Sequence, residues 1–244
     1  MIKILATSDL HGILPNIKDE FDLLLICGDV CPAHDHYYAF QIEWLMVDFV
    51  EWINKLPFRN NDAKVVMTWG NHDFVGERIT DQDKRKLETL TDNRLKILNF
   101  EEYVFPYWNM ENMQKINIRI FGTPYCETFG NWAFMRDLDK LREIYENIPE
   151  DIDILLTHDA PTLHNLGLIQ QGRNNGKMAG NVALDEIILK RKPKYVFCGH
   201  IHTGNHNITY ADGIKMVNVA LINEYYNEAY DVLKIDLDDE LKIV

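Results

Sequence analysis

Groups able to bind a metal ion follow five apolar runs of this sequence. One set, Asn71-His72-Asp73, comes after Gly70 at the end of the run 64–68. A glycine, an amide, an imidazole and a carboxylate in succession are typical of a sharp turn that presents polar groups outward. An ordinary tight turn has the same composition, so the interpretation as a site depends on the four other places where this construction recurs. Together the five places supply Asp9, His11, Asp29, Asn71, His158, His200 and His202.

Two of the five places hold candidate ligands two positions apart. Asp9 and His11 form one pair, and His200 and His202 form the other. Extended backbone points positions i and i+2 to the same side, so each pair can bind from a single loop. Because sites in open α/β sheets form outside the carboxyl ends of the strands, we expect all these side chains to meet at one edge.

The runs that carry these residues predict buried strands. They are continuous rather than alternating, which is typical of strands covered on both faces, and they comprise residues 2–7, 22–27, 64–68, 152–157 and 195–198. Further strands are expected at residues 95–98, 102–105, 116–120 and 231–235, with a hairpin and its Asp-Gly turn over 208–219. Helices are predicted at residues 38–56, 80–91, 137–147 and 181–190. This order predicts an α/β fold, a four-layer α/β/β/α sandwich of two mixed β-sheets flanked by helices.

Length and charge restrict the domain organisation and the partners. With 244 residues, 46% of them hydrophobic, residues 1–244 are expected to form a single domain. A formal net charge of −13 disfavours broad contact with another polyanion, so duplex nucleic acid and membranes are not expected partners. The first apolar run is too brief for a signal peptide, and none is long enough to cross a bilayer. The four cysteines lack a paired spacing and are expected to be buried thiols, as in a cytoplasmic protein, rather than a disulfide or zinc framework: Cys27, Cys31, Cys126 and Cys198.

The order and identity of the polar blocks resemble those of the calcineurin-like metallophosphoesterase superfamily. The blocks are Asp9-x-His11, Gly28-Asp29, Gly70-Asn71-His72-Asp73, His158 and Gly199-His200-x-His202. The resemblance implies two divalent metal ions. One would be held by Asp9, His11, Asp29 and His202, and the other by Asn71, His158, His200 and the shared Asp29. His72 is not a ligand in the family's pattern, and we expect it to protonate the leaving group or stabilise its charge, with Asp73 orienting it. A structural imidazole within the turn is the alternative.

The charges of such a centre would bind phosphate without lysine or arginine. Two divalent ions bring four positive charges, Asp9 and Asp29 remove two, and a bridging hydroxide removes one, so the centre stays positive. Metal ions about 3.5 to 4 Å apart clamp a phosphoryl group and lower the pKa of bound water. We therefore expect in-line hydrolysis of a phosphate ester by a metal-bridging hydroxide. The mixed ligands suit manganese, iron or zinc, and manganese is expected to support activity.

The sequence differs from other branches of the superfamily at positions that matter for their substrates or metals, and these differences reduce the number of expected substrate classes. Purple acid phosphatases place a metal-bound tyrosine three residues after the bridging aspartate, where Pro32 stands here. Protein Ser/Thr phosphatases carry an arginine shortly after that aspartate, which residues 30–33 lack. Residues 122–125, 132–134 and 157–161 are similar to the small single-domain metallophosphoesterase-domain phosphodiesterases. That resemblance implies a phosphodiesterase acting on small nucleotide-type or cyclic nucleotide diesters. A phosphomonoesterase acting on small molecules or phosphoproteins, and a non-catalytic scaffold, remain as alternatives.

Outside the blocks, several side chains keep two interpretations each. Four loop histidines are expected at the surface rather than against substrate: His34, His36, His164 and His206. Asn181 is expected to cap its helix rather than touch substrate. Trp132 and Phe134 either stack on a base or line an apolar cleft, or else they pack in the core. Arg173 and Lys177 either meet a distal phosphate or are solvated, and solvation is favoured.

Overall fold

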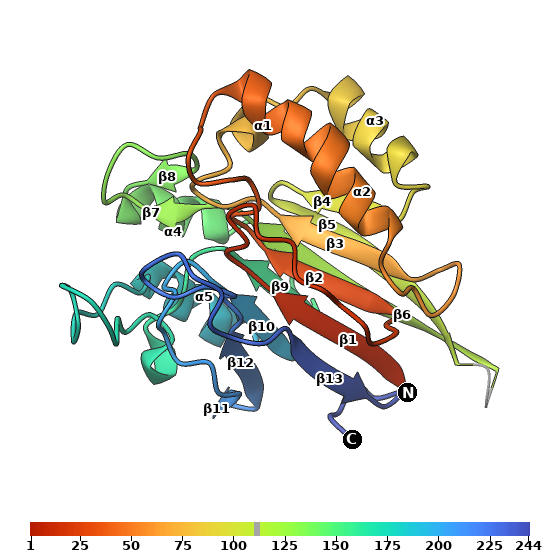
Figure 1. The fold of residues 1–244 in the computed structure, drawn as a ribbon. Coiled ribbons are helices and arrows are strands. Elements are labelled where there is room, and N and C mark those ends of the chain that lie inside the picture. The colour runs from red at the N-terminus through yellow and green to blue at the C-terminus, as the bar shows by residue number, and fades with distance from the viewer. Residues whose placement is uncertain (110–112) are drawn as a thin grey trace.

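Two β-sheets pack face to face, and helices cover the outer face of each (Figure 1). The computed structural model describes residues 1–109 and 113–244. The strand order in the first sheet is β13 (Leu233–Leu237), β1 (Ile2–Thr7), β2 (Leu23–Cys27), β3 (Lys64–Thr68) and β4 (Leu95–Leu98). In the second sheet it is β11 (Thr209–Ala211), β12 (Ile214–Asn218), β10 (Tyr195–Cys198), β9 (Ile154–Thr157), β6 (Gln114–Thr123) and β5 (Glu101–Asn109). Both sheets are mixed, because β13, β11 and β5 pair antiparallel with their neighbours while the central strands are parallel.

The helices divide between the two outer faces. On the first sheet lie α1 (Tyr38–Trp44), a π-helical turn at Leu45–Phe49, α2 (Val50–Asn54) and α3 (Asp81–Leu90). On the second sheet lie α4 (Leu138–Tyr145) and α5 (Val182–Arg191). Shorter elements are the 3-10 turns Phe74–Glu77 and Leu163–Asn165 and the paired strands β7 (Cys126–Glu127) and β8 (Met135–Arg136). Every helix within the two described ranges is too short or too polar to cross a membrane.

Packing on both faces of the sheets explains why the strands are apolar at successive positions. In β2, Leu23 and Leu25 point between the sheets, whereas Leu24 and Ile26 pack with the helices of the first outer layer. All four side chains are inaccessible to solvent. Successive residues of a strand point to opposite faces, so a strand covered on both sides needs apolar residues throughout. The prediction of a four-layer α/β/β/α sandwich is therefore confirmed.

The bounds of the elements differ from expectation mainly at the sheet edges. β5 extends beyond the predicted residues 102–105 and includes Pro106. Proline removes a hydrogen-bond donor from the ladder, and it is tolerated here because β5 is an edge strand. β13 lies two residues beyond the predicted range 231–235, because its register with β1 pairs Ile235 with Ile4. The helix predicted for residues 38–56 ends at Asn54 and contains the π-helical turn.

The parallel strands of both sheets end on the same side of the molecule. The arrowheads of β1, β2, β3, β9 and β10 all point to that side in Figure 1. β1, β2 and β3 are neighbours in the first sheet, β9 and β10 are neighbours in the second, and β2 lies against β9. The residues that follow these strands are therefore brought together from distant parts of the chain.

Adjacent residues of β5 allow a test of the core between the sheets. Phe105 is 1% exposed and packs between the sheets, whereas Val104 is 44% exposed on the other face. We expect Phe105→Ala to lower the free energy of unfolding by about 3–5 kcal/mol, because it leaves a cavity. Val104→Ala should change it by less than about 1 kcal/mol. Urea unfolding measures both, and equal losses would be inconsistent with this packing.

Candidate metal centre

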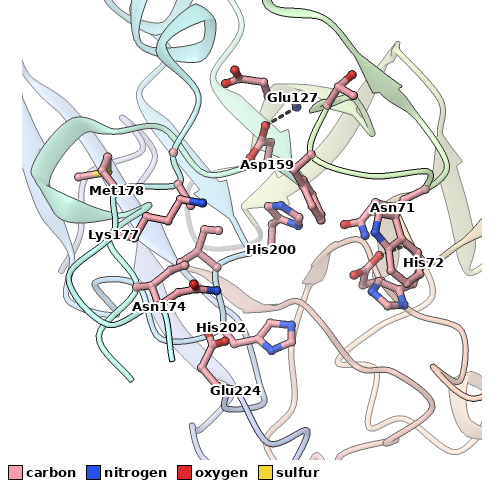
Figure 2. Close-up of a pocket in the computed structure, with 18 of the residues that line it drawn as sticks. Asn71, His72, Glu127, Asp159, Asn174, Lys177, Met178, His200, His202 and Glu224 are labelled. Atoms are coloured by element: carbon pink, nitrogen blue, oxygen red, sulfur yellow. Dashed lines mark hydrogen bonds between the residues drawn. The ribbon is translucent and has the colours of Figure 1, made fainter. Parts of the chain in front are cut away.

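The seven candidate ligands follow the carboxyl ends of five strands. Asp9, Asp29 and Asn71 come two or three residues after β1, β2 and β3, while His158 and His200 come one or two residues after β9 and β10. His11 and His202, which lie two positions after Asp9 and His200, complete the set. Figure 2 shows His200 and His202 facing Asn71 and His72 across the floor of a cleft. The structure thus brings together all seven side chains that the sequence analysis singled out.

One group of ligands gathers around Asp9. The Nε2 atom of His202 lies 3.5 Å from Oδ1 of Asp9, and Nε2 of His11 lies 3.5 Å from Oδ2 of Asp29. Two ligand atoms that each lie about 2.1 Å from one tetrahedral cation are about 3.4 Å apart. The spacing of these nitrogens and oxygens therefore suits a shared cation. Nδ1 of His202 donates to the carbonyl of Asn223 over 3.2 Å, which leaves its Nε2 lone pair free to bind.

A second group gathers around His158. Its Nε2 atom lies 3.4 Å from Oδ2 of Asp29 and 2.9 Å from Oδ1 of Asn71. Its Nδ1 donates to the carbonyl of Cys27 over 2.8 Å, so here too Nε2 is the nitrogen available to a metal. The ring of His200 lies 5.1 Å from that of His158. Asp29 contacts both groups and lies where a bridging ligand would be needed.

The ring of His11 gives independent support for a bound cation. Both of its nitrogens are buried, and neither has a hydrogen-bond partner among the described residues. A buried polar atom without a partner is costly, and such atoms in native structures commonly mark an ion or a water. The residues present therefore fit a cation at this place.

The backbone at the ligands is held in a strained conformation. Asp9, His11, Asp29 and His200 have positive φ angles of 54°, 44°, 51° and 66°. Each such residue costs about 1–3 kcal/mol and persists only where the surrounding structure enforces it, which is common at functional sites. Gly70 is needed beside them, because a Cβ atom there would lie 2.2 Å from Oδ1 of Asp29.

The electrostatics of the cluster favour added positive charge. Burial raises the pKa of Asp9, but the hydrogen bond and charge of His202 prevail and lower it to about 2. Burial lowers the pKa of His158, but Asp29 and Asp9 prevail and raise it to about 10. The buried carboxylates thus draw protons onto the imidazoles when no metal is present. Burial and the charge of His158 lower the pKa of His200 to about 3, so its ring stays neutral and able to act as a ligand.

His72 lies at the edge of the ligand cluster, whereas Asp73 is buried beneath the turn. A ring nitrogen of His72 lies within 4.8 Å of ligand atoms of His11 and Asp29, at the edge of the cluster. Asp73 is buried beneath the turn, and its carboxylate accepts hydrogen bonds from the backbone N–H groups of Val30, Cys31 and Gly70 at 2.9–3.2 Å. These bonds hold the loops together. The sequence suggested that Asp73 would contact and orient His72, but its partners are these backbone groups. A ring nitrogen of His72 instead contacts His36.

His36 contacts His72, although the sequence favoured a surface position for it. Its Nε2 atom lies 3.2 Å from Nδ1 of His72. Trp132 also contacts His72, with the two rings 4.3 Å apart and inclined by 30°. Phe134 is buried in the core, whereas Trp132 lines the cleft. Asn181 caps α5 as predicted, since its side chain accepts from the N–H groups of Ala183 and Leu184.

The cleft above the cluster has a volume of about 540 Å³. His72 and the loop that carries Lys177 lie on opposite sides of the cleft in Figure 2. Trp132 and Phe129 also line it, and the ring of Phe129 lies 5.3 Å from that of His200. Lys177 is the only lysine or arginine among the described lining residues, and Arg173 is not one of them. Several lining residues were missed by the sequence analysis because they lie in loops outside the motif blocks: Glu127, Asn174, Met178, Glu224 and Tyr226.

Comparisons with known proteins give matches over most of the chain. Residues 2–204 match the family model described as calcineurin-like phosphoesterase. Metallophosphoesterase domain-containing protein 1 of Homo sapiens is 30% identical over an alignment of 247 positions, which covers 96% of this chain and 71% of that protein. A UPF0046 protein of Caenorhabditis elegans is 28% identical over 231 residues, or 93% of this chain and 76% of that protein. Among solved structures, GAP50, described as the anchor in the inner membrane complex of Plasmodium, has a TM-score of 0.51 at 7% identity and covers 90% of this chain and 71% of that chain.

Replacing Asp29 by Asn is expected to abolish stabilisation by added Mn²⁺. A cation that binds only the folded protein raises its Tm as the cation concentration rises, and Asp29 contacts both groups of ligands. Thermal unfolding at increasing Mn²⁺ should therefore show a rising Tm for the wild type and a constant Tm for Asp29→Asn. Asp139→Asn removes a carboxylate from a side chain that is 97% exposed on α4 and is the matched control. A rise in Asp29→Asn equal to that of the control would contradict the assignment.

Proposed function

Because this chain belongs to the calcineurin-like phosphoesterase family and is a metal-dependent phosphoester hydrolase, we propose that it is a phosphodiesterase acting on small nucleotide-type or cyclic nucleotide diesters. The charge distribution of the cleft is the observation that supports a diester most directly. Glu127, Asp159 and Glu224 line it, with Lys177 as the single cation of the described lining. A diester carries one negative charge where a monoester carries about two at neutral pH. Acidic walls therefore disfavour the monoester relative to the diester.

The shape and the walls of the cleft support a small nucleotide. Its volume of about 540 Å³ lies within the range of small-molecule sites. Trp132 and Phe129 offer aromatic faces beside the proposed metal centre, and Phe129 is 62% exposed. Exposed aromatic rings stack on bases with little dependence on sequence. A phosphoryl group at the floor and a base against one of these rings would occupy the cleft together.

Seven residues would hold two divalent cations at the floor of the cleft. In our proposal Asp9, His11, Asp29 and His202 bind one, and Asn71, His158, His200 and the shared Asp29 bind the other. When bound, two such cations supply Lewis acidity to the phosphoryl oxygens and a hydroxide nucleophile from water at neutral pH. Manganese is the proposed activating metal, with iron and zinc as alternatives for the same ligands. The four free, buried cysteines agree with a reducing compartment, and we propose the cytoplasm.

His72 is the proposed donor to the leaving oxygen. It lies at the edge of the cluster and lines the cleft, where an ester oxygen would depart. Its ring N–H would donate to that oxygen as negative charge develops there. Asp73 acts as a positioning residue, because it ties the turn that carries His72 to the loop after β2.

Hydrolysis of two chromogenic esters with added Mn²⁺ tests the proposed function. We expect bis-p-nitrophenyl phosphate to be cleaved with a kcat/KM at least about tenfold above that of p-nitrophenyl phosphate, for the reason of charge given above. A preference for the monoester would indicate a phosphomonoesterase. Turnover of neither ester, with both metals bound, would support the scaffold alternative. A panel of cyclic and linear nucleotides would then identify the substrate class.

Replacing His72 by Ala is expected to lower kcat by about 10²- to 10⁴-fold on 3′,5′-cyclic AMP, whose leaving group is a strongly basic alkoxide. The loss on bis-p-nitrophenyl phosphate should be smaller, because p-nitrophenolate needs little stabilisation as it leaves. Metal analysis of the variant should give the same content as the wild type. Equal losses on both substrates, or loss of metal, would argue against this role for His72.

A further inference from the structure

A ring nitrogen of His36 lies within hydrogen-bond distance of a ring nitrogen of His72, and we propose that His36 is a positioning residue for the leaving-group step. Its Nε2 atom lies 3.2 Å from Nδ1 of His72, which leaves Nε2 of His72 for the cleft. In this assignment His36 fixes both the orientation of the ring of His72 and the nitrogen that carries its hydrogen. The inference deepens the proposed function, because it rests on the role of His72 as the donor to the leaving oxygen.

Aromatic contacts confine both imidazoles. The ring of His72 stacks on Trp132 at 4.3 Å, and the ring of His36 meets the same indole edge-on at 5.3 Å and 87°. Phe74 also contacts His36, with the ring centroids 5.2 Å apart. Rings packed in this way cannot rotate freely, so the hydrogen bond between them keeps one geometry.

The buried side chain of Gln41, on α1, joins the backbone segments that carry the two histidines. The amide nitrogen of Gln41 donates to the carbonyl of His72 over 2.7 Å and reaches the carbonyl of Asp35 over 3.4 Å. Its amide oxygen accepts from the N–H of Val75 over 2.8 Å. Gln41 is inaccessible to solvent, so these bonds are not exchanged with water. The segments that carry His36 and His72 are therefore tied to one group.

The hydrogen bond decides what His72 presents to the substrate. A neutral imidazole has one donor and one acceptor nitrogen. If Nε2–H of His36 donates to Nδ1 of His72, the hydrogen of His72 resides on Nε2 and faces the cleft. The opposite tautomer would present a lone pair to a leaving oxygen that is gaining negative charge, and would repel it. Asp73 is not available for this task, because backbone N–H groups occupy its carboxylate.

Substitution of His36 tests the proposal by activity. His36→Phe keeps a ring against Trp132 and removes the hydrogen bond. We expect kcat on 3′,5′-cyclic AMP to fall by about 10- to 100-fold, with KM changed less than about threefold and bis-p-nitrophenyl phosphate affected far less. His36→Gln keeps a side-chain N–H donor and should recover part of the loss. The control is His34→Phe, since His34 is exposed and its ring contacts Phe40 instead. A His36→Phe enzyme that matches the control on cyclic AMP, or that loses both activities equally, would overturn the proposal.

Nuclear magnetic resonance of the imidazole nitrogens supplies a readout that needs no turnover. In the holoenzyme with Zn²⁺, which is diamagnetic, His72 should show one tautomer with its hydrogen on Nε2. His36→Phe should give a mixture of tautomers, and His34→Phe should not. An unchanged single tautomer in His36→Phe would overturn the positioning role. If the wild type cleaves neither the diesters nor the monoester, the proposed function fails, and the tautomer measurement still decides whether His36 positions His72.

Discussion

The site must compensate the negative charge of two buried carboxylates that lack a lysine or arginine partner. Asp9 and Asp29 are inaccessible to solvent, and in the described part of the chain the side chains that pair with them are imidazoles. Burying an ion without compensation costs several kcal/mol. Divalent cations at this place would supply the missing charge and would also satisfy one of the two unpartnered nitrogens of His11. The same charge gives an acidic protein a compact site for an anionic phosphate ester.

The two sheets meet this requirement through topology. Parallel strands of both sheets end at the same side, so short loops can bring ligands from residues 9 to 202 within contact distance. The layers beneath the loops are closely packed, which keeps the strand ends fixed. That rigidity maintains the strained backbone at Asp9, His11, Asp29 and His200, because the strands on both sides of the cluster fix where each loop begins. Family membership and the geometry of the cluster thus point to the same kind of centre.

The clustering of the candidate ligands was predictable from the sequence because they follow apolar runs closely, and such runs are local signals of buried strands. The buried parallel strands of the two mixed sheets were predictable for the same reason. The bounds of β5 and β13 were not predictable, because the ends of an edge strand depend on its pairing with the neighbouring strand rather than on its own residues. His36 was also misjudged. It lies far from His72 in the chain, and they meet only through the course of the loop before α1 and the bonds of Gln41, which no local pattern encodes. The acids of the cleft walls likewise come from loops whose paths depend on tertiary contacts.

Anomalous diffraction from crystals grown with Mn²⁺, recorded at the manganese absorption edge, tests the central claim most directly. Two peaks are expected, one beside Asp9, His11 and His202 and the other beside Asn71, His158 and His200, with the carboxylate of Asp29 between them. A single peak away from Asp29, or no peak in this cluster at saturating Mn²⁺, would contradict the dinuclear centre.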